Sequence, residues 1–125
     1  MKGTAMKETI LLFGFQDLPS ILAVQKAVAP IEVKPVGRSE YGQTIAALAG
    51  LEAPKGSAYT GPALPGRMLV LCGLGDQVER LLPLLRAAGA GPECLKAVLT
   101  PSNRSWTALT LYTELYREHQ AMTKR

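Results

Sequence analysis

The sequence has few of the residues from which metal centres and most catalytic sites are built. Its 125 residues include one histidine, His119, and two cysteines, Cys72 and Cys94, without the spacing of a metal site. The cysteines stand in apolar stretches, which is typical of reduced core thiols in a cytosolic protein. Glu114 and Glu118, near His119, are predicted to form a solvated helix surface. No motif of nucleophilic catalysis is present, so we assign no catalytic residue, no metal and no cofactor.

Long apolar runs and dense charge clusters are also missing. No apolar run approaches the roughly 18 residues of a membrane helix, and the short run at residues 10–15 lacks the flanks of a signal peptide. The net charge is only +4, and no basic run exceeds the pair Lys124 and Arg125. A nucleic-acid surface normally carries a denser basic stripe. We therefore expect a cytoplasmic protein that does not bind a membrane, and the scattered charge disfavours nucleic-acid binding.

Four short apolar runs are predicted strands. The runs at residues 9–15 and 68–74 are almost wholly apolar, as in strands that are covered on both faces. Residues 31–36 and 94–99 are the other two. Pro35 cannot donate a backbone hydrogen bond, so its strand should be short or should lie at a sheet edge.

A stretch with helical periodicity follows each of these runs. Asp17 and Asp76 stand where helix N-caps are expected. Pro83 should kink the third helix or delay its start. The expected helices are residues 18 to about 28, residues 41–50, one after Asp76 that ends at Gly89, and one from about Ser105 or Trp106 to about Met122.

The order of these elements repeats across a linker. Residues 52–66 contain three prolines and three glycines, which leaves no room for regular structure. We interpret the flanking segments, 8–51 and 67–122, as pseudo-repeat halves of a single domain, residues 1–125. An internal duplication would explain the repetition. The alternative is that alternating βα proteins resemble themselves in any case.

This alternation predicts an α/β fold: two βαβα halves form one small, mostly parallel four-stranded sheet with about four helices. If the halves join through the first and third strands, the strand order is 2-1-3-4. A ligand would then bind at the switch point where the chain leaves residues 15–16 and 74–75. The alternative is two split halves, each with a ferredoxin-like or antiparallel element. Open sheet edges lead us to expect a homodimer.

The segment GRSEYGQT, residues 37–44, has the glycine spacing of a phosphate-binding P-loop. A P-loop also needs a lysine that reaches the terminal phosphates, and Gln43 stands at that position. Aligning Tyr41 with Trp106 finds no matching glycines in the second half. The turn at residues 73–76 likewise lacks the third glycine of a dinucleotide-binding fingerprint. Both segments are therefore predicted to be strand-to-helix turns.

The turn TPSNRSW, residues 100–106, is the leading candidate for a binding site. Its polar side chains precede a helix whose first amides favour an anion, Arg104 adds positive charge, and Trp106 offers a ring for stacking. The alternative is structural: the polar residues hold the turn, and Trp106 anchors the core, as Tyr41 would in the first half. The candidate ligand-binding residues are Thr100, Ser102, Asn103, Arg104, Trp106, Arg38 and Tyr41.

The stretch KAVLTPSNRSW, followed by LTLYTELYREH, resembles a bacterial family filed as domain of unknown function 3783. The family segment would cover about residues 67–120, and the first half looks like the companion segment of some members. The resemblance implies a small bacterial cytosolic protein and brings no reaction, cofactor or catalytic residue. The positions that match the family's motif are Lys96, Ala97, Val98, Leu99, Thr100, Pro101, Asn103, Trp106, Glu118 and His119.

Four functions remain open, in decreasing order of support. The first is a non-catalytic regulatory or small-ligand-binding module, for which an anionic small molecule is the candidate ligand. The second is a protein-interaction or scaffold protein that uses the last helix. The third is an enzyme that acts on an anionic metabolite through Arg38, Asn103 and Arg104. The fourth is RNA binding, in which Tyr41 and Trp106 would stack on bases.

Overall fold

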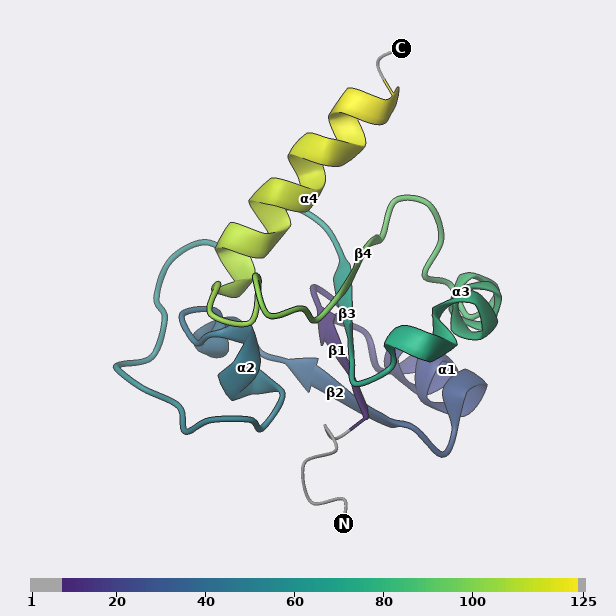
Figure 1. The fold of residues 1–125 in the computed structure, drawn as a ribbon, viewed down its shortest axis with the longest axis horizontal. Helices are drawn as coiled ribbons and strands as arrows, with labels where there is room; N and C mark the ends of the chain where they lie inside the picture. Colours follow the sequence, from purple (N-terminus) through teal and green to yellow (C-terminus); the bar gives the residue numbers. More distant parts are fainter. Residues whose placement is uncertain (1–7, 124–125) are drawn as a thin grey trace.

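The four strands form one sheet in the order β2-β1-β3-β4, which confirms the predicted order (Figure 1). The computed structural model describes residues 8–123. Pro35 lies in β2 at one edge of the sheet, and β4 forms the other edge. The strands are β1 (Thr9–Phe13), β2 (Glu32–Val36), β3 (Met68–Cys72) and β4 (Leu95–Val98).

The sheet is mostly parallel, but its two central strands are antiparallel. β1 runs parallel to β2 and β3 runs parallel to β4, whereas Thr9 of β1 lies opposite Cys72 of β3. The carboxyl ends of β1 and β3 therefore lie at opposite ends of the sheet, and the prediction of a switch point shared by residues 15–16 and 74–75 is wrong. Apart from Thr9 both strands are apolar, so their side-chain pattern does not encode their relative direction.

The helices cover both faces of the sheet. On one face, α1 (Leu18–Val28) and α3 (Val78–Ala87) pack side by side, and on the other lie α2 (Ile45–Leu48) and α4 (Ala108–Thr123). Short 3₁₀ turns, Arg38–Glu40 and Gly75–Gln77, precede α2 and α3. Within residues 8–123, no helix is long and apolar enough to cross a membrane.

The central strands bury side chains on both faces. Ile10 and Leu12 of β1 pack with α1 and α3, whereas Leu11 and Phe13 pack with α2 and α4. All five residues of β1 and all five residues of β3 are buried. This two-sided burial explains why their sequences are continuous apolar runs and do not alternate.

The helix starts follow the expected capping chemistry only in part. α1 has the predicted bounds, because Asp17 Oδ2 accepts a hydrogen bond from the N–H of Ser20 at 3.0 Å. Asp76 does not cap α3 and lies in the 3₁₀ turn before it. α3 then continues through Pro83, whose exposed ring removes one N–H from the helix ladder without breaking the helix.

Thr44 and Thr107 occupy equivalent places in the two halves. Thr44 Oγ1 accepts from the N–H of Ala47 at 3.1 Å, Thr107 Oγ1 accepts from the N–H of Thr110 at 3.3 Å, and the two threonines pair in an antiparallel bridge. α2 and α4 consequently begin later than predicted. The same sequence offset relates the starts of β2 and β4, so Tyr41 corresponds to Arg104, and its predicted alignment with Trp106 is wrong by two residues. The internal duplication itself stays a prediction.

Candidate functional site

The GRSEYGQT segment is a strand-to-helix turn, as predicted, and it anchors the linker. Gly37 has φ −78°, so it does not use the left-handed conformation that glycine permits. Gln43, at the position of the P-loop lysine, donates from Nε2 to the carbonyl of Lys55 at 2.6 Å and accepts from the N–H of Lys55 at 2.8 Å. Its side chain is thus committed to holding the linker against this turn.

Asn103 holds the TPSNRSW turn from inside. Its side chain is 8% exposed. Its Oδ1 accepts from the N–H of Thr100 at 2.9 Å, and its Nδ2 donates to the carbonyl of Val98 at 3.1 Å. The N–H of Asn103 in turn donates to Thr100 Oγ1 at 3.2 Å. Both ends of the amide therefore serve the turn, which favours the structural alternative for this residue.

The predicted site residues do not converge on one cavity. Four of them, Thr100, Ser102, Asn103 and Trp106, line a cavity of about 330 Å³ between β4 and α4. The charged residues of this lining are the carboxylates Glu114 and Glu118. Arg104 is exposed outside this lining, and its carbonyl accepts from the N–H of Ala46 at 2.9 Å. The carboxylates that line the cavity beside Trp106 therefore disfavour the binding of an anion there.

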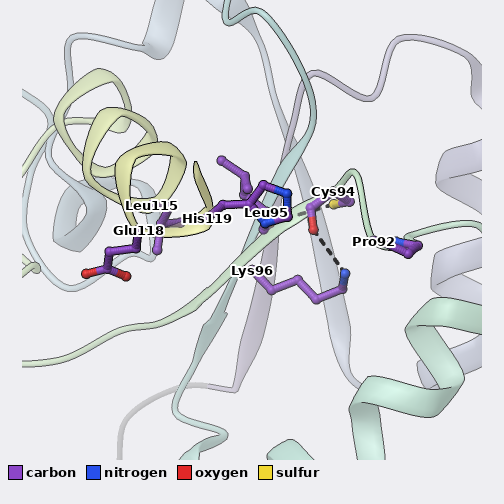
Figure 2. A pocket seen from close by; sticks show the side chains of 7 residues that line it. All are labelled: Pro92, Cys94, Leu95, Lys96, Leu115, Glu118 and His119. Atoms are coloured by element: carbon purple, nitrogen blue, oxygen red, sulfur yellow. Dashed lines mark hydrogen bonds between the residues drawn. The ribbon is translucent and has the colours of Figure 1, made fainter. Parts of the chain in front are cut away.

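A neighbouring cavity brings Cys94 and His119 together, which the sequence did not suggest. It measures about 260 Å³ and lies where β4 begins beside α4 (Figure 2). Burial raises the pKa of Cys94 to about 11 and that of Cys72 to about 12, so both thiols stay protonated at neutral pH. Within residues 8–123, no cluster of His, Cys, Asp and Glu could hold a metal ion. The pairing offers neither a thiolate nucleophile nor a metal centre.

The crevice that best fits a ligand lies at the carboxyl ends of β1 and β2. After β1 the chain turns toward α1 on one face, and after β2 it turns toward α2 on the other. Such a divergence opens a crevice at the ends of adjacent parallel strands. The cavity has a volume of about 340 Å³ and is lined by Gly14, Phe15, Gln16, Val36, Gly37, Arg38, Tyr41 and Ala63.

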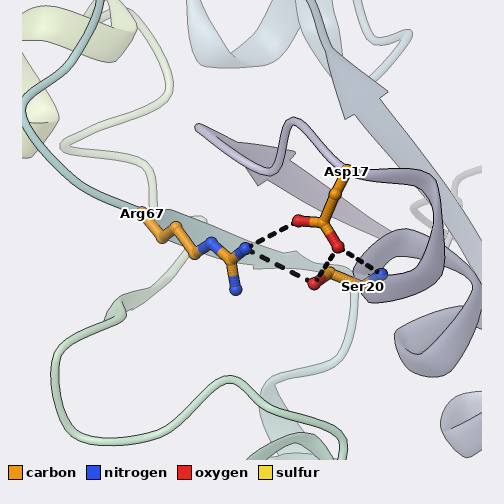
Figure 3. A network of polar contacts seen from close by, with 3 residues as sticks. All are labelled: Asp17, Ser20 and Arg67. Atoms are coloured by element: carbon orange, nitrogen blue, oxygen red, sulfur yellow. Dashed lines mark hydrogen bonds and ion pairs between the residues drawn. The ribbon is translucent and has the colours of Figure 1, made fainter.

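Gly14 lines one wall of this crevice, and Arg67 packs on the neighbouring lining residue Phe15. Gly14 has φ +81°, and a Cβ there would lie 2.6 Å from the carbonyl oxygen of Gly66. The Arg67 guanidinium lies 4.5 Å from the centre of the Phe15 ring. It also donates to Asp17 Oδ1 at 3.0 Å and to Ser20 Oγ at 3.4 Å (Figure 3). Hydrogen bonds from Ser20, with a smaller contribution from Arg67, hold the pKa of Asp17 below its usual value. The bonds to Asp17 and Ser20 hold the Arg67 guanidinium in place against the Phe15 ring.

Arg38 is the charged residue of the crevice lining. It is exposed, and no ion pair between described residues involves it. Tyr41 is 3% exposed, with its ring centre 6.2 Å from that of Phe13 and 5.9 Å from that of Tyr59. Burial raises the pKa of Tyr41, against the opposing effects of the Gly14 backbone and of Arg38. Tyr41 is thus a neutral floor residue, and its burial against Phe13 and Tyr59 disfavours the alternative in which it stacks on an RNA base.

Comparison with known proteins gives a family for one half of the chain. Residues 67–122 match the model of the family described as Domain of unknown function (DUF3783), which confirms the resemblance found in the C-terminal half. No curated protein and no solved structure matches the chain. The crevice lies on strands β1 and β2, outside the matched residues. From the sequence we predicted two of its lining residues, Arg38 and Tyr41, as ligand-binding residues. We also predicted a ligand beside residues 15–16, but at a switch point shared with residues 74–75, which follow β3.

Proposed function

We propose that this protein is a non-catalytic binding module that holds a small anionic molecule in the crevice beside Arg38. The proposal rests on one observation above all: a cavity of about 340 Å³ opens where β1 and β2 diverge, with an exposed guanidinium at its rim. Crevices at the carboxyl ends of parallel strands are the usual ligand sites of open α/β sheets. The volume falls in the range of small-molecule sites.

The lining favours a carboxylate or phosphate on a small apolar body. Arg38 presents a planar fork of donors that matches either anion in two parallel hydrogen bonds. Gln16 is exposed beside it and offers both an amide donor and an acceptor. Phe15, Val36 and Ala63 supply apolar contact. One charged group with apolar walls suits a ligand that carries a single anionic group.

A binding role is better supported than a catalytic one. The enzyme alternative required Arg38, Asn103 and Arg104 to act together, yet Arg38 and Asn103 line different cavities. Asn103 also uses both ends of its side-chain amide within its own turn. Tyr41, the titratable neighbour of Arg38, has a raised pKa and is not poised to act as a base near neutral pH.

Isothermal titration calorimetry with small carboxylic acids, sugar phosphates and nucleotides tests this proposal. The wild type should bind at least one of these anions, and Arg38→Ala should weaken that binding by roughly tenfold or more, since a charge-assisted bidentate contact is lost. Arg104→Ala is the matched control, because it removes an exposed arginine from the equivalent turn of the other half. Equal losses in the two variants, or no binding to any anion, would contradict the proposal.

A further inference from the structure

The two edges of the sheet differ in how they are closed. The β2 edge contains Pro35, which has no N–H to offer another strand. At the β4 edge, the N–H of Leu95 donates to the carbonyl of Arg67 at 3.0 Å, and the N–H of Leu99, directly after β4, donates to the carbonyl of Leu71 at 2.9 Å. The alternation of a strand then turns the N–H groups of the residues between, Lys96 and Val98, away from β3. The β4 edge therefore keeps donors for a further strand.

Lys96, the lysine of this edge strand, is engaged in hydrogen bonds to the backbone. Edge lysines usually project outward and discourage pairing with another chain. Here Lys96 Nζ donates to the carbonyl of Gly91 at 2.8 Å. It also donates to the carbonyl of Cys94 at 3.0 Å (Figure 2). The ammonium group is thus tied to the chain that leads into β4. An incoming strand would not have to displace a free, hydrated charge.

Cavities flank β4 on both faces of the sheet. On the α3 face, a cavity of about 140 Å³ is lined by Leu71, Val78, Leu82, Lys96, Ala97 and Val98. On the α4 face, the cavities of about 330 and 260 Å³ share Leu115 and Glu118, so they adjoin each other along the strand, and we refer to them together as the α4 groove. Side chains of an added strand would point alternately into the two grooves, which is how β-augmentation gains specificity.

The α4 wall of this edge is acidic in a chain that is basic overall. Glu114 and Glu118 line the groove, while the net charge of the chain is +4. Glu114 is paired with Arg117 at 2.8 Å, which leaves Glu118 as the carboxylate shared by both cavities. The groove therefore favours a basic side chain whose aliphatic stem covers Leu115 and whose charge meets Glu118.

We propose that the β4 edge binds an extended peptide segment of a partner protein, with apolar residues facing α3 and basic residues facing α4. A second copy of this chain fits less well. Antiparallel pairing of two β4 strands about a twofold axis normal to the sheet would bring like faces together, with the acidic walls of the two α4 helices on the same side. A basic, alternating peptide meets opposite charge on that wall.

Two synthetic peptides of equal length, one alternating valine with lysine and the other alternating valine with glutamate, test this inference. Both would be titrated into the ¹⁵N-labelled full chain, with amide shifts and amide hydrogen exchange recorded. The lysine peptide should bind roughly threefold more tightly, with the +4 charge of the chain acting against it. Its binding should shift and protect the amides of Lys96 and Val98. Equal affinities, no binding, or shifts away from β4 would overturn the proposal.

Charge reversal at the groove gives a second test. A reversed preference between the two peptides cannot result from partial unfolding, which would weaken the binding of both. Glu118→Lys should reverse the preference, so that the glutamate peptide binds better. Glu79→Lys is the matched control, because it makes the same charge change at an exposed residue of α3 that lines none of the cavities described above. The same shift of preference in both variants would show that net charge, and not the groove, sets the preference, and would contradict the proposal. Shifts at β4 that depend on protein concentration without peptide would assign the edge to a second copy.

Discussion

The two halves of the molecule share an order of elements and differ at the ends of their strands. In the first half, β1 and β2 end at an open crevice with Arg38 at its rim. In the second half, the position of Phe15 is taken by Leu74, which is fully buried. The position of Arg38 is taken by Pro101, which carries no charge. The cavities of the second half lie instead along β4, beside α3 and α4. The cavities thus lie at the strand ends in one half and along a strand edge in the other.

The linker contributes to this difference, since it forms part of the wall of the first half's crevice. Ala63 completes the lining, and Gly66 approaches Gly14 so closely that a side chain is excluded. Gln43 fastens the linker to the turn after β2. The residues between the halves therefore form part of the proposed binding site as well as connecting the two halves.

The largest expected effect comes from breaking the contact between Gly14 and the linker. Gly14→Ala should lower the free energy of unfolding by about 3 kcal/mol, because the new methyl group meets the Gly66 carbonyl in a left-handed backbone conformation. Gly50→Ala has nearly the same φ, +84°, but open space around its Cβ, so it should cost only about 1 kcal/mol. Urea denaturation of both variants measures the difference. Equal losses in the free energy of unfolding would contradict the predicted clash with the Gly66 carbonyl.

The next effect compares equivalent turns. Asn103 and Glu40 each accept a hydrogen bond from the N–H three residues earlier, Asn103 at 2.9 Å and Glu40 at 3.3 Å. Asn103 is buried and makes further bonds, so Asn103→Ala should destabilise the protein by about 2 kcal/mol. Glu40→Ala should cost less than about 0.5 kcal/mol. Thermal unfolding of the two variants decides this, and a Glu40→Ala loss as large as that of Asn103→Ala would contradict the assigned roles.

A smaller effect concerns the thiols, both of which lie in the second half. Their pKa values rise from 9.0 to about 12 for Cys72 and about 11 for Cys94, because burial disfavours the thiolate. The unfolded chain releases these protons first, so stability should fall as pH rises above about 9. Each thiol should account for about 1 kcal/mol by pH 10. Unfolding of wild type and of a Cys72→Ala, Cys94→Ala double variant at pH 7 and pH 10 measures this, and identical pH dependence would refute it.

Local chemistry in the sequence predicted some features correctly. The bounds and cap of α1 follow from Asp17 and the apolar periodicity after it, and Pro35 correctly placed β2 at an edge. The strand order was also predicted, but the antiparallel pairing of β1 and β3 was not. Two strands that are buried on both faces carry no alternation from which their relative direction could be inferred.

The candidate site was harder to predict, because burial and turn geometry decide what a polar residue does. Asn103 could be expected either to bind a ligand or to hold its turn, and its hydrogen bonds show that it holds the turn. Tyr41 is buried against Phe13 and Tyr59, residues far from it in the sequence. The crevice beside Arg38 depends on strand divergence and on the path of the linker, which no local motif encodes.

An amide shift map with the tightest-binding anion would test the central claim most directly. If the crevice binds it, saturable shifts should concentrate at residues 14–16 and 36–41, and Arg38→Ala should raise the anion concentration that saturates them by roughly tenfold or more. The amides of residues 100–106 and the Trp106 indole should stay unchanged. Shifts confined to residues 100–106, with none at residues 14–16, would contradict the claim and would return the binding role to the turn in the second half.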